Sequence, residues 1–293
     1  MKVFVTGVGG QLGYDVMQEL QQRGHEAVGS DLRCGDYELD ITNAEAVHKV
    51  LTEVKPDAVI HCAAWTAVDA AEDVPNIPVV HAVNVRGTQN IANECQRLAC
   101  KLMYISTDYV FNGQGEEPWQ PDCKDYAPLN VYGKTKLGGE LAVAETISKY
   151  FIVRIAWVFG KNGNNFIKTM LNVGKRFPEL RVVNDQVGTP TYTFDLARLL
   201  VDMIETEKYG YYHATNEGGY ISWYDFACEI FRQAGYATKV KAVTTAEYGL
   251  SKAKRPFNSR LDKSKLVEAG FKPLPTWQDA LKRYLKEFED GTN

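Results

Sequence analysis

The sequence predicts an α/β protein with a doubly wound parallel sheet and a smaller lobe toward the C-terminus. Three observations support this prediction. Short apolar strands alternate with helices in the first half of the chain, a glycine-rich turn follows the first strand, and polar motifs follow the later strands. Strands and helices that alternate in this way form a parallel sheet with right-handed crossovers. A ligand is expected at the carboxyl ends of such strands, where the polar motifs lie.

The first half of the chain gives these elements in order. The helix predicted at residues 12–23 carries its apolar residues on one face, as the helical period requires. Thr42 followed by Glu45 predicts a capping box that opens the next helix, which runs to Val54. The predicted strands are residues 2–6, 26–30, 58–62, 101–106 and 151–156, and the two later helices are residues 83–98 and 131–149.

The regular alternation then ends, and the rest of the chain predicts the smaller lobe. Residues 181–184 and 211–214 are apolar enough to add strands to the main sheet. Residues 223–234 and 277–288 have the spacing of amphipathic helices. Residues 244–275 show no clear period. Because no flexible linker separates the two parts, we expect the lobe to be interleaved with the sheet domain.

The composition describes an ordinary globular protein and excludes several partners. Of the 293 residues, 45% are hydrophobic and 24% are charged, which suits a normal core. The net charge of −4 argues against nucleic acid or an anionic membrane surface as a partner. No apolar run approaches the ~18 residues of a membrane span, and strand-like sequence from Lys2 leaves no room for a signal peptide. The six cysteines form no zinc motif, so we expect a cytoplasmic protein with free thiols.

Three glycines, Gly7, Gly10 and Gly13, lie in the turn between the first strand and the first helix. They let the backbone turn tightly and approach a pyrophosphate, which the free N–H groups of the helix N-terminus attract. Asp31 ends the second strand at about the distance expected for a carboxylate that binds ribose hydroxyls. The unit therefore predicts a Rossmann-like, dinucleotide-binding domain. We assign this domain to residues 1–157, with its sheet completed by parts of 181–214, and a substrate-binding lobe to residues 158–180 and 215–293.

Tyr132 and Lys136 lie four residues apart in a predicted helix, so both side chains can face one cleft. A phenol has a pKa near ~10, and a nearby ammonium group is expected to lower this pKa and suit the phenol to acid–base chemistry. Lys136 can also donate to the ribose hydroxyls of a nicotinamide cofactor. Thr107 follows the strand at 101–106 and is placed to hold a carbonyl oxygen beside the Tyr132 hydroxyl.

These motifs together resemble the extended short-chain dehydrogenase/reductase family over nearly the full chain. Within the family, the likeness is closest to members that reduce the 4-keto group of a sugar carried on deoxythymidine diphosphate (dTDP). None of the eight motifs is decisive alone, but their order is specific. They are GxxGQLG at 7–13, AAWTAVDAAE at 63–72, NVRGT at 84–88, STDYVF at 106–111, PLNVYGKTKLGGE at 128–140, RIAWVFG at 154–160, NDQVGTPT at 184–191 and RPFNSRLD at 255–262.

The resemblance implies a role for individual residues, with NADPH or NADH as cofactor and a dTDP-sugar as substrate. Thr107 and Tyr132 are implied to be catalytic, with Lys136 as their partner at the cofactor. The expected cofactor-binding residues, which include the glycine turn and Arg33, are Gly7, Gly10, Gln11, Leu12, Asp31, Arg33, Asp40, Ile41, Ala63, Ala64, Trp65, Tyr132 and Lys136. The implied sugar-nucleotide contacts are Val68, Thr107, Asp108 and Trp157. Trp65 stands where a smaller aromatic residue or a histidine is common in the family.

Charged residues bear on cofactor choice and on the substrate diphosphate. Asp31 favours the free 2′-hydroxyl of NADH, whereas Arg33 is placed to pair with the 2′-phosphate of NADPH, so we expect both cofactors to work. Arg255 and Arg260 lie in a basic stretch of the C-terminal part. The planar guanidinium group suits bidentate phosphate contacts, so we expect at least one of the two arginines to bind the diphosphate.

Two other interpretations and two properties stay open. A sugar-nucleotide epimerase or dehydratase shares the scaffold, but such dehydratases place an acidic pair after the position of Thr107, and here Asp108 is followed by Tyr109. A relative of the family serves as a regulatory subunit of methionine adenosyltransferase, without catalysis. Some relatives are magnesium-linked dimers, so Mg²⁺ and a homodimer stay open, with no ligands identified for the metal.

Overall fold

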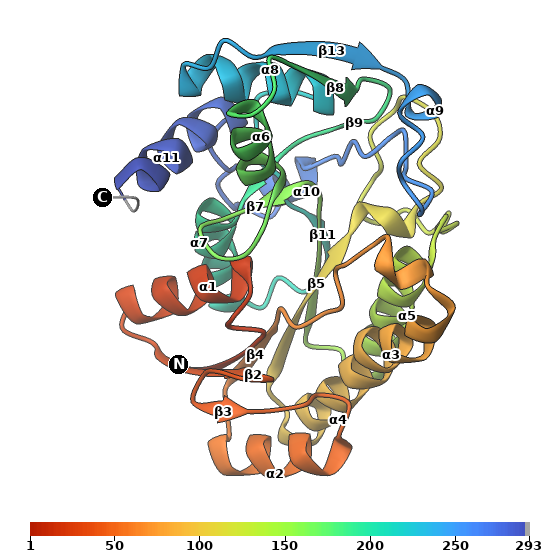
Figure 1. Ribbon diagram of the computed structural model, residues 1–293. Coiled ribbons are helices and arrows are strands. Elements are labelled where there is room, and N and C mark those ends of the chain that lie inside the picture. The colour runs from red at the N-terminus through yellow and green to blue at the C-terminus, as the bar shows by residue number, and fades with distance from the viewer. Residues whose placement is uncertain (291–293) are drawn as a thin grey trace.

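A seven-stranded, wholly parallel sheet forms the centre of the protein, as the computed structural model of residues 1–290 shows (Figure 1). The strand order is β11-β6-β5-β4-β1-β2-β3. This order reverses direction at β1 and β4, as the doubly wound prediction requires. The strands are β1 (Lys2–Thr6), β2 (Glu26–Asp31), β3 (Tyr37–Glu38), β4 (Ala58–His61), β5 (Lys101–Thr107), β6 (Tyr150–Ile155) and β11 (Gly210–His213).

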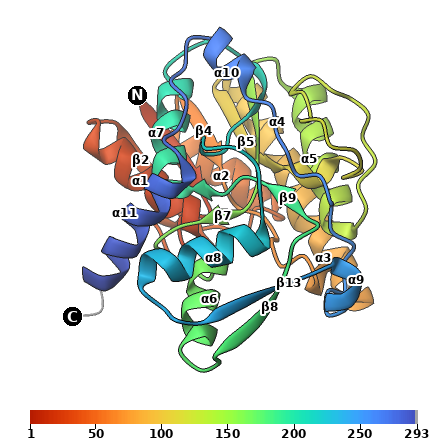
Figure 2. The same ribbon diagram turned by 90° about the horizontal axis from the view of Figure 1, so that it is seen from above.

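Helices cover both faces of the sheet and enclose two separate cores (Figures 1 and 2). Alternate residues of one strand point to opposite faces, so Met103 of β5 packs into one core and Tyr104 into the other. The first face is covered by α1 (Gln11–Gln22) and α7 (Thr193–Ile204). The second is covered by α2 (Ala44–Val54), α4 (Thr88–Leu98) and α5 (Val131–Thr146).

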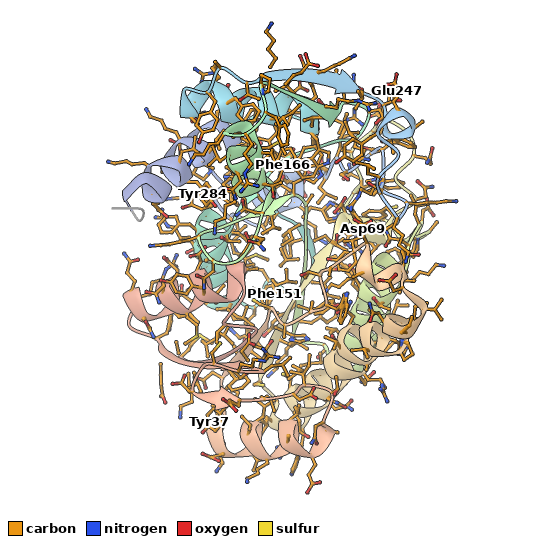
Figure 3. All side chains as sticks on the ribbon, viewed as in Figure 1. Tyr37, Asp69, Phe151, Phe166, Glu247 and Tyr284 are labelled. Carbon is orange, nitrogen blue, oxygen red and sulfur yellow. The ribbon has the colours of Figure 1, made fainter. Side chains whose placement is uncertain are left out.

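The smaller lobe lies over the carboxyl ends of the strands, at the top of Figure 1. Its own aromatic core includes Phe159, Tyr192, Phe226 and Tyr284. Figure 3 shows Phe166 and Tyr284 within this lobe and Phe151 within the sheet domain. The helices of the lobe are α6 (Phe166–Gly174), α8 (Trp223–Ala234), α9 (Thr245–Tyr248) and α11 (Trp277–Asp290). The short helix α10 (Ser264–Glu268) lies in the part of the chain assigned to the lobe, but its Leu266 packs into the first core of the sheet domain. Its short strands are β7 (Val158–Phe159), β8 (Glu179–Val183), β9 (Val187–Gly188), β10 (Thr191–Tyr192), β12 (Ile221–Ser222) and β13 (Lys239–Val243).

The prediction for the second helix was wrong at its first residue. The N-cap of α2 is Asn43, whose side chain accepts a hydrogen bond from the Ala46 backbone N–H. Thr42 instead belongs to the turn before the helix, where its N–H and its hydroxyl both donate to Asp40 Oδ1, at 2.9 and 2.8 Å. Both residue types cap helices well, so the local sequence could not separate them.

Of the two strands expected to extend the main sheet, one does so. The segment at 211–214 corresponds to β11, which pairs with β6 at the edge of the sheet. The segment at 181–184 was placed wrongly: it lies in β8, which pairs with β13 in a separate two-stranded sheet. Glu179 and Arg181 of β8 are exposed, whereas a strand inside a parallel sheet is buried on both faces.

The helix predicted at 83–98 begins earlier and is not uniform. It starts as α3 (Ile77–His81), passes through a π-helical segment, η3 (Ala82–Gly87), and continues as α4. Short π segments occur often at functional sites. The helix predicted at 131–149 ends at Thr146, and residues 291–293 of the predicted lobe lie outside the described residues.

Candidate active site

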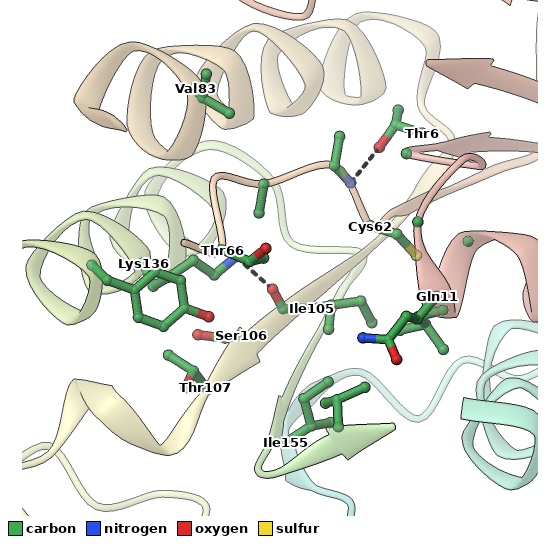
Figure 4. A pocket seen from close by; sticks show the side chains of 18 of the residues that line it. Thr6, Gln11, Cys62, Thr66, Val83, Ile105, Ser106, Thr107, Lys136 and Ile155 are labelled. Atoms are coloured by element: carbon green, nitrogen blue, oxygen red, sulfur yellow. Dashed lines mark hydrogen bonds between the residues drawn. The ribbon is translucent and has the colours of Figure 1, made fainter. Parts of the chain in front are cut away.

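A cavity of about 480 Å³ lies at the carboxyl ends of the central strands, between the sheet and the lobe. The sheet predicts this position, because the crossover connections open a crevice where the strand order reverses. Figure 4 shows Gln11 and Lys136 on opposite sides of the cavity. Of the predicted residues, those that line it are Gly7, Gly10, Gln11, Leu12, Asp31, Asp40, Ile41, Ala63, Ala64, Val68, Thr107, Asp108, Tyr132, Lys136 and Trp157.

The glycine turn packs closely against the neighbouring strand end. Gly7 has a φ of 74°, and a Cβ atom there would lie 2.7 Å from the Ala63 backbone nitrogen. A Cβ atom at Gly13 would lie 2.2 Å from the Gly7 carbonyl oxygen. These positions therefore require glycine. The turn leads into α1, whose N-cap Gly10 provides no side-chain hydrogen bond, so this helix N-terminus faces the cavity uncapped.

Asp31 supports the turn and also lines the cavity. Its Oδ2 atom accepts a hydrogen bond of 3.1 Å from the Gly9 backbone N–H, and Oδ1 accepts one of 2.7 Å from Leu32. The carboxylate is therefore fixed at the end of β2. This is where the sequence placed a ribose-binding group.

The lobe fixes the orientation of Gln11. Asn165 caps α6, so its Oδ1 atom accepts the Lys168 backbone N–H at 3.0 Å. Its amide nitrogen must then be the atom that lies 3.1 Å from Gln11 and donates to Gln11 Oε1. The amide nitrogen of Gln11 is left as the group that can donate toward the cavity.

Lys136 is almost wholly buried, with 3% of its surface exposed. Its ammonium group donates a hydrogen bond of 2.7 Å to the Ile105 carbonyl oxygen and lies 4.0 Å from the centre of the Tyr104 ring. Burial lowers the pKa of Lys136 to about 7, and the nearby Glu140 opposes this shift. The lysine is thus anchored under the end of β5, beside the cavity (Figure 4).

The expected lowering of the Tyr132 pKa was wrong. Burial raises the pKa of the phenol above its ordinary value, the charge of Asp108 adds to the rise, and a hydrogen bond with Thr107 opposes it. Lys136 is not among the groups that lower this pKa, and its ammonium group donates to the Ile105 carbonyl oxygen. Tyr132 therefore keeps its proton at neutral pH, which is the form that can donate one.

Thr107 is part of a buried hydroxyl–carboxylate network with Asp108 and Ser259. The Thr107 hydroxyl donates to Asp108 Oδ1 at 3.0 Å, and the Ser259 hydroxyl donates to Asp108 Oδ2 at 2.5 Å. One acceptor site of Thr107 is taken by the Tyr109 backbone N–H, at 3.2 Å. Burial raises the pKa of Asp108 to about 6, although both hydroxyl hydrogen bonds oppose this rise. No role was predicted for Ser259 from the sequence, because this residue lies far from Asp108 along the chain.

A second buried network supports the cofactor side of the cavity. His61 lies between Thr6, at 2.7 Å from Nδ1, and Thr88, at 3.1 Å from Nε2. The one hydroxyl hydrogen of Thr88 goes to the Asn84 carbonyl oxygen, so Thr88 must accept the Nε2–H of His61, and Thr6 then donates to the free Nδ1 of the neutral ring. Thr88 in turn donates to the Asn84 carbonyl oxygen at 2.9 Å. Burial lowers the pKa of His61 to about 3, so the ring stays neutral in this role.

Asn84 lies in the π-helical segment, and no site role was predicted for it from the sequence. It is buried, accepts the Trp65 N–H at 2.8 Å and donates to the Thr135 hydroxyl at 3.0 Å. It thus joins the loop after β4 to α5, directly beside Lys136. The NVRGT motif was the signal that could have found it.

Four predicted residues do not line the cavity: Arg33, Trp65, Arg255 and Arg260. Arg33 is exposed two residues beyond Asp31. Arg255 pairs with Asp69 at 2.6 Å and lies 3.3 Å from the hydroxyl of Tyr109, which does line the cavity. Arg260 instead contacts the Asn258 side chain at 3.1 Å.

Two tryptophans form one wall of the cavity. The rings of Trp157 and Trp223 are stacked with their centres 3.8 Å apart. Trp157 has a φ of 50°, which is rare for a bulky residue, and such conformations cluster at functional sites. Trp223 was predicted only as part of a helix, since nothing local shows that α8 reaches the cavity.

Neither a metal cluster nor a membrane span is found in the described part of the chain. Within residues 1–290, no three His, Cys, Asp or Glu side chains form a group that could hold a metal ion, so the structure supplies no location for Mg²⁺. None of the helices described is long and apolar enough to cross a membrane.

Known proteins share the sequence and the fold of this chain. The family model described as the RmlD substrate binding domain matches residues 1–290. A dTDP-4-dehydrorhamnose reductase of Aggregatibacter actinomycetemcomitans is 41% identical over 96% of this chain and 97% of that protein. The crystal structure of a dTDP-4-dehydrorhamnose reductase of Clostridium acetobutylicum has a TM-score of 0.93 and 42% identity, over 99% of this chain and 100% of that one. That of the Bacillus anthracis dTDP-4-dehydrorhamnose reductase, in complex with NADP, has a TM-score of 0.91 and 41% identity, over 98% and 100%. The chain belongs to the RmlD substrate binding domain family.

Proposed function

We propose that this protein uses NADPH or NADH to reduce the 4-keto group of dTDP-4-dehydro-β-L-rhamnose, giving dTDP-L-rhamnose. The observation that carries the proposal is that Tyr132, Lys136 and Thr107 line the same cavity as the glycine turn. One cavity thus joins a proton donor to a dinucleotide-binding unit. Relatives of nearly equal length are named for this reaction.

The residues of the cavity fit a nicotinamide dinucleotide. The glycine turn brings bare backbone to the cavity, where a Cβ atom at Gly7 would collide with Ala63. The uncapped start of α1 and the Gln11 amide offer donors to a diphosphate, and Asp31 offers acceptors to ribose hydroxyls. Asp40, Ile41, Ala63 and Ala64 complete this side, and Arg33 is the group placed to meet a 2′-phosphate. When bound, the reduced cofactor supplies the hydride.

The protein's own side chains handle the proton. As the carbonyl carbon is reduced, negative charge develops on its oxygen, and Tyr132 donates its proton to that oxygen. The high pKa of Tyr132 keeps this proton available at neutral pH. Lys136 is fixed at Ile105 and holds positive charge near the phenolate that proton transfer leaves behind. Burial makes each of these interactions stronger than it would be in water.

The wall opposite the glycine turn is proposed to bind the sugar nucleotide. Val68, Asp108 and Trp157 line it, and Arg255 lies at its margin through its contact with Tyr109. We assign cofactor binding to residues 1–157 with β11, and substrate binding mainly to 158–180 and 215–293. A homodimer stays a prediction.

The dehydratase alternative is disfavoured by the residue after Asp108. Tyr109 stands where the second acid is expected, and its hydroxyl lies near the Arg255 guanidinium group. A purely regulatory role has no specific observation in its favour.

The decisive experiment is to follow NADPH and NADH absorbance with the purified protein and dTDP-4-dehydro-β-L-rhamnose. We expect stoichiometric oxidation of the cofactor and formation of dTDP-L-rhamnose. Epimerisation without net oxidation of the cofactor indicates the epimerase alternative. Binding of both ligands without turnover indicates a regulatory role.

A further inference from the structure

Ser259 reaches the candidate active site from a distant part of the chain. It belongs to the RPFNSRLD motif, whose two arginines do not line the cavity. Ser259 itself is 2% exposed, and its hydroxyl donates to Asp108 Oδ2 at 2.5 Å. The motif therefore contacts Asp108 through its serine.

The backbone around Ser259 is fixed on both sides. The Ser259 N–H donates to the Val187 carbonyl oxygen at 2.8 Å, and the Val187 N–H donates to the Phe257 carbonyl oxygen at 2.8 Å. The Asn258 N–H donates to Gly113 at 2.8 Å, from the loop after η4 (Asp108–Val110). Because three hydrogen bonds fix the backbone of this segment, the Ser259 side chain loses little entropy when it keeps one orientation.

The hydrogens in this network can be counted. Ser259 and Thr107 each have one hydroxyl hydrogen, and both hydrogens go to the Asp108 carboxylate. While Tyr132 keeps its proton, the Thr107 hydrogen therefore points to Asp108, and the interaction of Thr107 with Tyr132 favours the phenolate form of the tyrosine. Once Tyr132 has given up its proton, its phenolate needs a donor, and the Thr107 hydroxyl can turn to it only if Asp108 keeps another partner.

We propose that Ser259 is a positioning residue: it holds Asp108 in place so that the Thr107 hydroxyl can turn from Asp108 to the Tyr132 phenolate. The proton moves from the Tyr132 oxygen to the substrate oxygen, and the Thr107 hydrogen rotates without leaving its own oxygen. Ser259 touches neither reacting atom and acts through Asp108. This inference rests on the proposed reductase function.

The surroundings of Asp108 make its titration a clean measurement. Two phenols, those of Tyr109 and Tyr132, feel the charge of Asp108. Burial raises the pKa of both phenols above the ordinary value, so neither changes its charge near neutral pH. The nearby cation, Arg255, pairs with Asp69.

The first test follows the NMR signal of the Asp108 carboxyl carbon in the unliganded protein from pH 4 to pH 9. This range extends at least about two pH units to either side of the Asp108 pKa of about 6. The signal is identified by its absence in Asp108→Asn. Loss of a hydrogen bond to a charged group should move the midpoint up by about one pH unit in Ser259→Ala. Ser259→Cys, with its weaker donor, should move it the same way. The matched control is Ser264→Ala, which removes a serine that donates to Asp262 at 2.5 Å on the surface.

The second test is a double-mutant cycle on turnover. Ser259→Ala should lower kcat about tenfold and leave the KM for NADPH unchanged, because the serine does not line the cavity and reaches it through Asp108. In the Asp108→Asn background the same change should lower kcat less than about twofold. The proposal is overturned if Ser259→Ala lowers kcat equally in both backgrounds. It is also overturned if Ser259→Ala does not shift the midpoint of the Asp108 titration. If even the unaltered protein does not reduce the keto sugar, the proposed function fails, while the titration still decides the role of Ser259.

Discussion

The Lys136 ammonium group lies 2.7 Å from the carbonyl oxygen of Ile105, at the end of the central strand β5. The cation is therefore held by the backbone of the sheet and not by the phenol four residues before it. Its position does not depend on how Tyr132 moves. It also places a positive charge in a region from which water is almost excluded.

The first prediction is that Tyr132→Phe removes the proton donor and keeps the ring. The ring contact with Tyr109, at 5.6 Å between centres, should survive, so dTDP and NADPH should bind almost normally. We expect kcat to fall by on the order of 10²-fold or more. The measurement is steady-state turnover beside calorimetric titration of both ligands. Near-normal turnover in this variant contradicts the role given to Tyr132.

The second prediction is that Lys136→Met stabilises the fold while it abolishes activity. The folded pKa of about 7 lies below the ordinary value of 10.5, so the unfolded chain binds more protons between these values. The loss of folding stability that the buried Lys136 charge causes is therefore greatest below pH 7, and it disappears as the pH rises toward 10.5. The free energy of unfolding of the variant should therefore exceed that of the unaltered protein at pH 7. This gap should shrink by about 2 kcal/mol by pH 9.

Chemical denaturation at both pH values measures this gap. Lys134→Met, at an exposed position of the same helix, controls for the loss of a lysine charge. A gap that is the same at pH 7 and pH 9 contradicts a depressed pKa at Lys136.

The third prediction concerns the cofactor. Arg33 is exposed beside Asp31, where a 2′-phosphate is expected, so Arg33→Ala should weaken NADPH binding about tenfold. NADH lacks this phosphate and serves as the internal control, with unchanged affinity. Fluorescence titration of the same preparation with both cofactors is sufficient. Equal losses show that Arg33 does not recognise the 2′-phosphate.

The fourth prediction concerns the substrate diphosphate. Arg255 contacts Tyr109 at the cavity, whereas Arg260 contacts Asn258, so Arg255→Ala should raise the Kd of dTDP about tenfold and Arg260→Ala should change it little. The affinity for NADPH should stay constant in both variants. If neither variant binds dTDP more weakly, the diphosphate is held elsewhere.

Much of the cofactor side could be predicted because its signals are local. Gly7 and Gly13 reveal a turn that admits no Cβ atom, and Tyr132 and Lys136 reveal a helical face. Asp31 follows from its place at the end of a strand. Each inference needs only neighbours along the chain, and each residue lines the cavity.

The remaining features depend on contacts between distant segments. Ser259 meets Asp108, and Trp223 stacks on Trp157, across separations that no local pattern encodes. The partner of β8 is likewise chosen by the lobe and not by the apolar pattern of the strand. The pKa of Tyr132 was predicted in the wrong direction because burial outweighs a lysine that is bound elsewhere.

The late position of β11 has a consequence for synthesis. Residues 210–213 form the edge of the sheet beside β6, whose Phe151, Ile152 and Val153 are fully buried in the finished protein. While the ribosome has made only the first 157 residues, β6 is an uncovered apolar edge strand, open to pairing with a neighbouring nascent chain. The main sheet therefore cannot be completed before the chain has been translated to residue 213. Slow translation between residues 157 and 213 should therefore increase aggregation.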